Sequence, residues 1–407
     1  MRVKMQAHMH QALINGRVLC GEGWVTDRTV LIDAGRILDV VSPHDPRCAS
    51  AICRDLGGGL LLPGFIDTQV NGGGGVMFND DPTVATIRTI AAAHRRFGTT
   101  SLLPTLISDD LSVISRAIAA VRSAISGGVP GVIGVHLEGP FLNEARKGTH
   151  DAGKFRKLDD AALTLLSSLE IGRTLVTLAP EMTAPALIAS LLARGVVISA
   201  GHTNATYAVI ENALRHGVTG FTHLFNAMSA MSSREPGVVG AALHDEDSWC
   251  GIIVDGHHVS PVVLQIALRC KRHDRFMLVT DAMANVGTAQ TSFLLQGKKI
   301  IVCDGKCVDE QGTLSGSALD MASAVRNAVA LLGIELADAV RMASTYPAQF
   351  LGLGHELGRI APGFRANFVL TDHDLNVVDT WIDGQSTGMV AMRSNVGASG
   401  EPSNRFE

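Results

Sequence analysis

Five short segments of the sequence place carboxylate and imidazole side chains directly after apolar runs. They are residues 136–140, 201–204, 222–228, 255–258 and 280–282. Each residue alone also fits a structural role, as a hydrogen-bonding histidine or a helix-capping aspartate. A carboxylate and several imidazoles that meet at one place, however, have the composition of a transition-metal site. Such a metal can lower the pKa of a water molecule and make it a nucleophile.

Alternating strand-like and helical patterns separate these polar segments. Eight apolar runs are typical of buried strands: 60–66, 101–107, 132–137, 175–179, 196–200, 220–224, 250–254 and 276–280. Helical patterns lie between most of them: 82–97, with Asp81 as N-cap, 111–125, 184–194, 207–216 and 261–269. Eight alternating units predict an α/β fold with a parallel sheet closed as a (β/α)8 barrel, and the mouth of that barrel would collect the polar segments.

A doubly wound open sheet is the alternative arrangement for alternating strands and helices. It would bind a nucleotide through a glycine-rich turn that opens a helix. The four glycines at 72–75 follow a strand-like run, but they lack the dinucleotide spacing and a capped helix start. The barrel is therefore the favoured prediction.

Both ends of the chain have the pattern of short strands and tight turns. Residues 13–19 predict a hairpin around Asn15-Gly16, and residues 30–38 predict a second one. Strand patterns return at 367–371 and 377–382, followed by a turn at Asp383-Gly384. We expect one small β-domain made of residues 1–61 and 356–407, with the barrel at 62–355.

Composition limits the possible partners and the compartment. The formal net charge of the 407 residues is −5, so no strong field would attract nucleic acid or an anionic membrane. The apolar runs are too short to span a bilayer, and the N-terminus lacks the apolar core of a secretory signal. Seven cysteines, an odd number without CxxC spacing, favour a reducing cytoplasm over a disulfide framework.

Several longer motifs carry a specific family resemblance. Residues 63–67 (PGFID), 136–141 (HLEGPF), 200–205 (AGHTNA), 222–228 (THLFNAM) and 279–282 (VTDA) resemble the N-acetylglucosamine-6-phosphate deacetylases of the amidohydrolase superfamily. The resemblance extends from about Leu13 to Gln385. It implies a (β/α)8 barrel with a small β-sandwich formed by both termini. It also implies hydrolysis of N-acetyl-D-glucosamine 6-phosphate to D-glucosamine 6-phosphate and acetate in amino-sugar catabolism.

The resemblance assigns roles by position. The metal ligands of the family fall on Glu138, His202 and His223, and its catalytic aspartate falls on Asp281. The histidine that polarises the acetyl carbonyl falls on His150. Asp281 would take a proton from the attacking water and return it to the departing nitrogen.

Substrate contacts implied by the family fall on Asn226, Ala227, Arg234 and His258. In such enzymes the arginine can come from the neighbouring subunit, which implies a homodimer. A solvated loop arginine is the alternative for Arg234. The segment 313–317, with Leu314, Ser315 and Gly316, either closes over the sugar or is an ordinary loop before a helix at 319–332.

One departure from the superfamily pattern bears on the number of metals. Many amidohydrolases have His-x-His after the first strand, where this chain has Gln69 and Asn71. Neutral amides are poor transition-metal ligands beside imidazole, so we expect one divalent metal per subunit. Zn²⁺ is the first expectation, with Fe²⁺, Mn²⁺ and Co²⁺ as alternatives.

Three other functions remain open at this level. One is a deacetylase for the galacto epimer, and another is a ring-opening hydrolase, against which Gln69 and Asn71 argue. The third is a catalytically silent phosphosugar-binding protein, which the presence of Asp281 and all three ligand positions disfavours.

Overall fold

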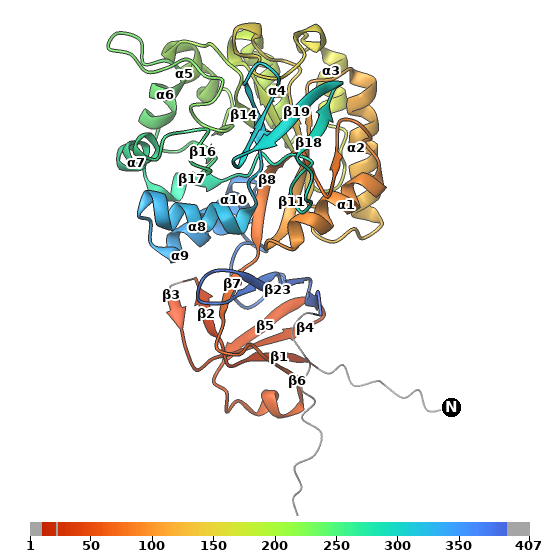
Figure 1. The fold of residues 1–407 in the computed structure, drawn as a ribbon, viewed down its shortest axis with the longest axis vertical. Coiled ribbons are helices and arrows are strands. Elements are labelled where there is room, and N and C mark those ends of the chain that lie inside the picture. The colour runs from red at the N-terminus through yellow and green to blue at the C-terminus, as the bar shows by residue number, and fades with distance from the viewer. Residues whose placement is uncertain (1–9, 22, 389–407) are drawn as a thin grey trace, which may run out of the picture.

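The centre of the molecule is a parallel barrel, seen in the upper half of Figure 1. The structure is a computed structural model that describes residues 10–21 and 23–388. Eight strands pair in chain order: β8 (Phe65–Val70), β11 (Thr99–Ile107), β12 (Gly134–Glu138), β13 (Arg173–Leu178), β14 (Val197–Ala200), β15 (Gly220–Phe221), β16 (Trp249–Ile252) and β17 (Phe276–Leu278). The predicted (β/α)8 barrel is confirmed.

The barrel closes at the seam between its first and last strands. Val70 forms a parallel bridge with Ala282, and the Asp281 N–H donates to the Gln69 carbonyl at 3.0 Å. Every residue of β8, β11 and β12 is buried, because helices cover the outside while side chains fill the inside. The closing segment therefore carries Asp281, the predicted catalytic aspartate.

Ten helices accompany the barrel strands in the described part of the chain. They are α1 (Val84–Arg95), α2 (Leu111–Ser126), α3 (Asp160–Leu166), α4 (Pro185–Ala193), α5 (Tyr207–Arg215), α6 (Gly237–His244), α7 (Pro261–Cys270), α8 (Met321–Leu332), α9 (Leu336–Met342) and α10 (Thr345–Phe350). The predicted N-cap of α1 was wrong: Thr83, in extended conformation, accepts from the Thr86 N–H, while Asp81 accepts from both threonine hydroxyls.

One boundary between strands was also predicted wrongly. The apolar run 60–66 is two strands, because β7 (Leu60–Pro63) ends before Gly64 and β8 begins after it. β7 pairs with strands of the small β-domain, and only β8 belongs to the barrel. A Cβ at Gly64 would lie 2.0 Å from the Thr100 hydroxyl, so the chain passes between the two domains at a point where only glycine fits.

The small β-domain, in the lower half of Figure 1, is a sandwich built from both chain ends. Its four-stranded sheet is made of β1 (Gln11–Ile14), β4 (Thr29–Asp33), β5 (Arg36–Val41) and β6 (Ile52–Asp55). Its six-stranded sheet is made of β2 (Arg17–Cys20), β3 (Gly23–Val25), β7, β22 (Phe368–Thr371), β23 (Val377–Ile382) and β24 (Gln385–Ser386). The predicted sandwich is confirmed, while the bounds 1–61, 62–355 and 356–407 stay a prediction.

The predicted hairpin at 13–19 is wrong although its turn is present. Asn15 has the left-handed φ of 56° that the Asn-Gly pair favours. The turn nevertheless carries the chain from one sheet to the other, because β1 pairs with β4 and β6 whereas β2 pairs with β3 and β7. The second predicted hairpin, β4 with β5, is confirmed.

A small antiparallel sheet, unforeseen from the sequence, lies beside the barrel mouth (β18 and β19 in Figure 1). It consists of β18 (Ser292–Leu295), β19 (Lys298–Cys303), β20 (Lys306–Val308) and β21 (Leu314–Ser317). The Gln296 amide donates to the Ser108 carbonyl at 2.9 Å, which joins the sheet to the end of β11. A two-stranded pair, β9 (Gly72–Gly73) with β10 (Val76–Met77), completes the strands.

Among residues 10–21 and 23–388, no helix combines the length and the apolar composition that crossing a membrane requires.

Candidate active site

A cavity of about 360 Å³ opens at the carboxyl-terminal mouth of the barrel. Most of the predicted site residues line it: Asn71, Glu138, His150, His202, His223, Asn226, Ala227, His258, Asp281, Leu314 and Gly316. Gln69 lies behind them, buried against two of their carboxylates. Ser315 and Arg234 do not line this cavity.

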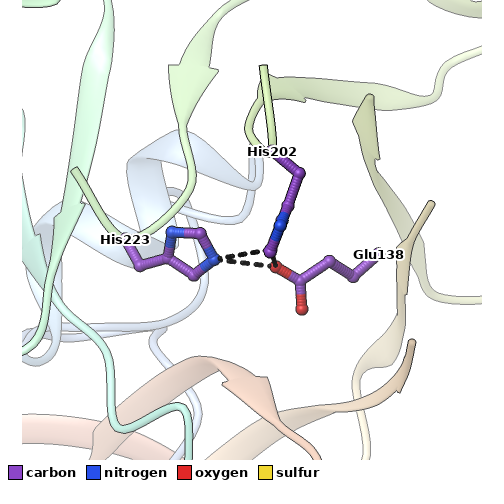
Figure 2. Close-up of side chains that lie close together, drawn as sticks. All are labelled: Glu138, His202 and His223. Atoms are coloured by element: carbon purple, nitrogen blue, oxygen red, sulfur yellow. Dashed lines mark hydrogen bonds and ion pairs between the residues drawn. The ribbon is translucent and has the colours of Figure 1, made fainter. Parts of the chain in front are cut away.

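The three predicted metal ligands converge from the ends of three strands (Figure 2). Glu138 Oε1 lies 3.2 Å from His202 Nε2 and 3.0 Å from His223 Nε2, and the two Nε2 atoms are 3.1 Å apart. His202 Nδ1 is 2.8 Å from the Arg146 carbonyl, which accepts and so requires the proton on Nδ1. The Nε2 lone pair therefore faces the other two groups, and this donor set fits one divalent cation.

Burial and partners determine the charge of Glu138. Burial raises the pKa of this carboxyl, but the imidazole rings of His202 and His223 beside it outweigh that effect and hold the pKa well below its usual range. Glu138 is therefore a buried carboxylate anion. A buried anion requires a cation or a proton nearby.

The backbone is strained where the chain turns into the site. His202, His223 and Asp281 have positive φ angles of 49°, 33° and 52°, a region that costs non-glycine residues roughly 1–2 kcal/mol each. Tertiary contacts in the barrel and its loops must offset this cost. The orientation of the three side chains is therefore fixed by these contacts and not by the local conformational preference of the backbone.

Glu181 holds one of these strained turns. Its carboxylate accepts from the Asn204 N–H at 2.7 Å and from the Thr203 hydroxyl at 2.5 Å, directly after His202. It also accepts from the Asn143 side chain at 2.9 Å, which ties together the loops after β12, β13 and β14. Glu181 was not among the site residues predicted from the sequence, although a glutamate after an apolar strand was a signal for it.

His150 presents a hydrogen-bond donor to the cavity. Its Nδ1 lies 2.8 Å from the Ser108 hydroxyl and 3.4 Å from the Ser108 N–H, which can only donate. Nδ1 is thus the acceptor, and the proton resides on Nε2. Burial, followed by the neighbouring His202, lowers the pKa of His150 well below its usual value, so the ring is neutral.

Asp281 is held by two amide side chains. Gln69 Nε2 donates to Asp281 Oδ1 at 3.1 Å and to both Glu138 oxygens at 3.2–3.3 Å. Asn71 Nδ2 donates to Asp281 Oδ1 at 2.6 Å. Burial and the Glu138 charge raise the pKa of Asp281 to about 6, so this carboxyl can both take and release a proton near neutral pH.

The two amides also bear on the number of metals. N–H groups of Gln69 and Asn71 face the Asp281 and Glu138 oxygens that could otherwise bind a second cation. A hydrogen-bonded N–H offers no lone pair, so these two amide nitrogens do not act as metal ligands in this arrangement.

Asp67 was not among the predicted site residues either, although the PGFID motif contains it. Its carboxylate is fully buried and accepts from the Thr280 hydroxyl at 2.5 Å and from the Gln69 N–H at 3.2 Å. The Thr280 carbonyl accepts from the Ser317 hydroxyl at 2.5 Å. Asp67 thereby fixes the peptide that carries Asp281, and we regard it as a positioning residue.

Replacing Thr280 by valine is expected to lower the free energy of unfolding by about 1–3 kcal/mol. The change keeps the shape of the side chain but leaves a buried Asp67 oxygen without its hydroxyl donor. Denaturant unfolding measures the effect. Thr371→Val is the matched control, because the buried Thr371 hydroxyl has no hydrogen-bond partner among the described residues. Equal losses in both variants would contradict the role given to Asp67.

Three of the predicted substrate contacts, Asn226, Ala227 and His258, line the cavity, and Arg234 does not. His258 Nδ1 is 2.6 Å from Asp255 Oδ2, and both side chains are almost fully buried. The carboxylate orients the ring so that Nε2 faces away from Asp255. Asn226 and Ala227 follow His223, and Ala227 has a positive φ of 51°. Arg234 is exposed in the loop before α6.

A comparison with known protein families gives a match to the amidohydrolase family over residues 60–387. The chain belongs to the amidohydrolase family. Amidohydrolases of this kind are metal-dependent hydrolases, and the buried Glu-His-His group of this member provides a place for a metal. The enzyme class implied by the sequence motifs is therefore confirmed.

Relatives of this amidohydrolase are named as deacetylases of 6-phosphorylated N-acetyl sugars. It is 47% identical to an N-acetylgalactosamine-6-phosphate deacetylase of Shewanella sp. (strain ANA-3), over 80% of this chain and 83% of the relative. It is 36% identical to an N-acetylglucosamine-6-phosphate deacetylase of Haemophilus influenzae, over 93% of this chain and 99% of the relative. The resemblance to this group of deacetylases is confirmed.

Solved structures confirm the fold of this amidohydrolase. The N-acetylglucosamine-6-phosphate deacetylase of Pasteurella multocida matches 93% of the chain with a TM-score of 0.90 and 36% identity, and all of that chain is covered. A mutant of the Mycobacterium smegmatis enzyme in complex with N-acetyl-D-glucosamine-6-phosphate matches 94% of this chain and 100% of its own, with a TM-score of 0.85 and 34% identity.

Proposed function

We propose that this amidohydrolase hydrolyses the acetamide of N-acetyl-D-glucosamine 6-phosphate, giving D-glucosamine 6-phosphate and acetate in amino-sugar metabolism. The observation that carries the proposal is the meeting of Glu138, His202 and His223 with Asp281 and His150 around one cavity. Relatives whose names give this activity match nearly the full length of the chain. We also propose the cytoplasm as the compartment, from the odd number of scattered cysteines.

Glu138, His202 and His223 would hold one divalent transition metal, with Zn²⁺ as the first choice. When bound there, the metal would supply Lewis acidity, which lowers the pKa of water towards about 7 and polarises a carbonyl. His150 Nε2 donates a hydrogen bond to the acetyl oxygen as negative charge develops on it. Asp281 takes the proton of the attacking water and passes it to the sugar nitrogen as the C–N bond breaks.

The phosphate group requires a cation that the cavity of one chain does not supply. Among the described residues, no lysine or arginine side chain lines it, and His258 is the histidine of its lining that has no assigned part in metal binding or in the reaction. We propose that Arg234 of a second subunit completes the phosphate site in a homodimer, together with Asn226 and Ala227. An exposed apolar side chain in that loop supports such an interface, because Met231 is 60% exposed.

The galacto epimer is the second candidate substrate. One observation favours it: the relative with 47% identity is an N-acetylgalactosamine-6-phosphate deacetylase. The two sugars differ only in the orientation of one hydroxyl group. A site that hydrogen-bonds that hydroxyl can discriminate strongly between them, so measured selectivity will separate the candidates.

A substrate panel tests the proposed function. The purified protein is assayed for acetate release from N-acetylglucosamine and N-acetylgalactosamine, each with and without the 6-phosphate. We expect the phosphorylated sugars to be far better substrates. Release of acetate from neither phosphorylated sugar, with metal bound, would reject a deacetylase of this class and leave a binding protein or another hydrolase.

About one tightly bound transition metal per chain is expected in the purified enzyme. The single Glu-His-His group and the N–H groups of Gln69 and Asn71 are the physical reason. Elemental analysis of the dialysed protein measures the ratio, and His202→Ala, which removes one ligand, should lose most of the metal. Two tightly bound metals per active chain would contradict the single-metal proposal.

A further inference from the structure

One side of the cavity is apolar, and no step of the proposed reaction uses it. Ile107, Met283, Leu295 and Leu314 all line this side. The first three are buried, with exposed fractions of 6%, 3% and 2%, and they pack into a single apolar cluster. They come from β11, from the segment after β17 and from β18, so the small sheet beside the barrel mouth supplies part of the surface. We call Ile107, Met283 and Leu295 the acyl wall.

The acyl wall lines the same cavity as the two groups that would act on the amide, His150 and Asp281. Ile107 directly precedes Ser108, whose hydroxyl contacts His150 at 2.8 Å. Met283 follows Asp281 by two residues and packs on the backbone of Gly316, where an added Cβ would lie 2.4 Å from its sulfur. The reacting carbon must be within reach of both His150 and Asp281, and the wall belongs to the lining of the cavity that these two residues share.

The geometry of an amide determines what would face the wall. The carbonyl carbon carries three substituents in one plane. Its oxygen must face His150, and its nitrogen must lie where Asp281 can deliver a proton. The third substituent is the acyl chain, which is a methyl group in an acetamide. An apolar methyl group gains most from contact with an apolar surface. The acyl chain is therefore expected to face the acyl wall, which is the apolar part of the cavity lining.

We propose that the acyl wall receives the acyl chain and limits its length, so that Ile107, Met283 and Leu295 determine specificity for N-acetyl over longer N-acyl amino sugars. This inference rests on the proposed deacetylase function and adds the basis of its acyl selectivity. The ligand class of this subsite is a short alkyl group on an amide carbonyl.

The residues of the acyl wall have little freedom to move aside for a longer acyl chain. Ile107 is fixed through its backbone, because Asn79 accepts from its N–H at 2.9 Å and donates to its carbonyl at 3.1 Å. The Met283 N–H donates to the Ser317 carbonyl at 3.1 Å, and Leu295 lies on a strand paired with β19. Close-packed surroundings of this kind penalise even one extra methylene group.

The test compares N-acetyl, N-propanoyl and N-butanoyl hexosamine 6-phosphates by release of the free amine, a signal that does not depend on the acyl group. For the wild-type enzyme, kcat/KM is expected to fall by roughly tenfold to two-hundredfold from acetyl to propanoyl. Ile107→Ala and Leu295→Ala should raise the propanoyl-to-acetyl ratio by about tenfold or more, since each opens space for at least one methylene group.

Leu294→Ala is the matched control. Leu294 adjoins Leu295 on β18, but its side chain is 59% exposed and points away from the cavity. The same number of carbons is removed, and the ratio should stay at the wild-type value. Ile107→Val removes only one methyl group and is measured beside Ile107→Ala in case the alanine variant does not fold. It should move the propanoyl-to-acetyl ratio in the same direction.

Two other outcomes are distinguishable. If the variants lower kcat/KM for all three substrates by the same factor, the wall contacts the sugar ring and the inference is overturned. An unchanged ratio in folded variants would also overturn it. Failure of the wild-type enzyme to release amine from any phosphorylated sugar would instead reject the proposed function.

Discussion

Asp281→Asn is expected to lower kcat by a factor of about 10²–10⁴ while the metal stays bound. An asparagine cannot take a proton from water or return one to the leaving nitrogen, and that transfer is the contribution assigned to Asp281. The proposed ligands Glu138, His202 and His223 are unchanged, so elemental analysis should give the wild-type metal content. Steady-state kinetics on the phosphorylated substrate measures kcat.

The contacts of Asp281 indicate that asparagine can replace it without a change in the orientation of the side chain. In Asp281 the Oδ1 atom accepts from Gln69 and Asn71, and the carbonyl oxygen of an asparagine can accept the same two bonds. The positive φ of 52° is also one that asparagine tolerates. The orientation of residue 281 should therefore persist, and the loss of kcat should report proton transfer and not misfolding.

Asp247→Asn is the control for Asp281→Asn. It removes the same charge from an exposed position outside the cavity, and kcat should stay near the wild-type value. If Asp281→Asn retains nearly normal kcat with its metal bound, another group is the base. Loss of metal in that variant would instead make Asp281 a ligand.

The barrel was predictable because strand type and order are encoded locally. Each of the eight barrel strands overlaps one of the apolar runs, since strands covered on both faces contain almost only apolar residues. The same apolar composition is the reason why the boundary between β7 and β8 at Gly64 was not predicted. β7 and β8 are both fully buried, so no change in hydropathy marks the passage from one domain to the other.

Strand pairing was less predictable than strand position. The Asn15-Gly16 turn has the local conformation that its residues favour, but its two strands do not pair with each other. β1 pairs with β4 and β6 in one sheet, and β2 pairs with β3 and β7 in the other. A turn motif fixes the direction of the chain over a few residues. Which edge a strand joins depends on the burial of distant segments, which no local pattern records.

The site was predicted mainly through the family motifs, and its missed parts have a common cause. Leu295 lies on β18, where exposed and half-buried residues give no clear pattern of a site. Along β21, Leu314 and Gly316 face the cavity, while Ser315 between them points to the other side, as strand periodicity requires. Ser315 therefore does not line the cavity, and its part in the site stays a prediction.

Arg234→Ala is expected to raise KM for the phosphorylated substrate by roughly tenfold to a hundredfold. A charge-assisted bond to phosphate contributes about 1.5–3 kcal/mol, and about 1.4 kcal/mol corresponds to one factor of ten. Activity on the unphosphorylated sugar should hardly change. Arg116→Ala, at an exposed arginine on α2, is the control. Equal losses on both substrates would indicate that Arg234 serves the fold or the reaction itself.

The loop structure explains how Arg234 could act beyond its own barrel. Glu235 accepts from the Tyr207 N–H at 2.8 Å and from the Gly237 N–H at 2.9 Å, which fixes the turn on both sides. The Ser232 N–H donates to the Glu235 carbonyl at 2.9 Å. Arg234 is therefore presented to the outside from an ordered turn, and it loses little backbone entropy when it binds a partner's ligand.

Mixing Arg234→Ala chains with Asp281→Asn chains tests whether the site is shared between subunits. In a mixed dimer, one site combines the intact Asp281 of one chain with the intact Arg234 of the other. Random pairing of equal amounts makes about half of the dimers mixed, so about a quarter of the sites, and of the wild-type activity, should return. If mixed dimers form and no activity returns, Arg234 serves the site of its own chain, and the proposed interface is wrong.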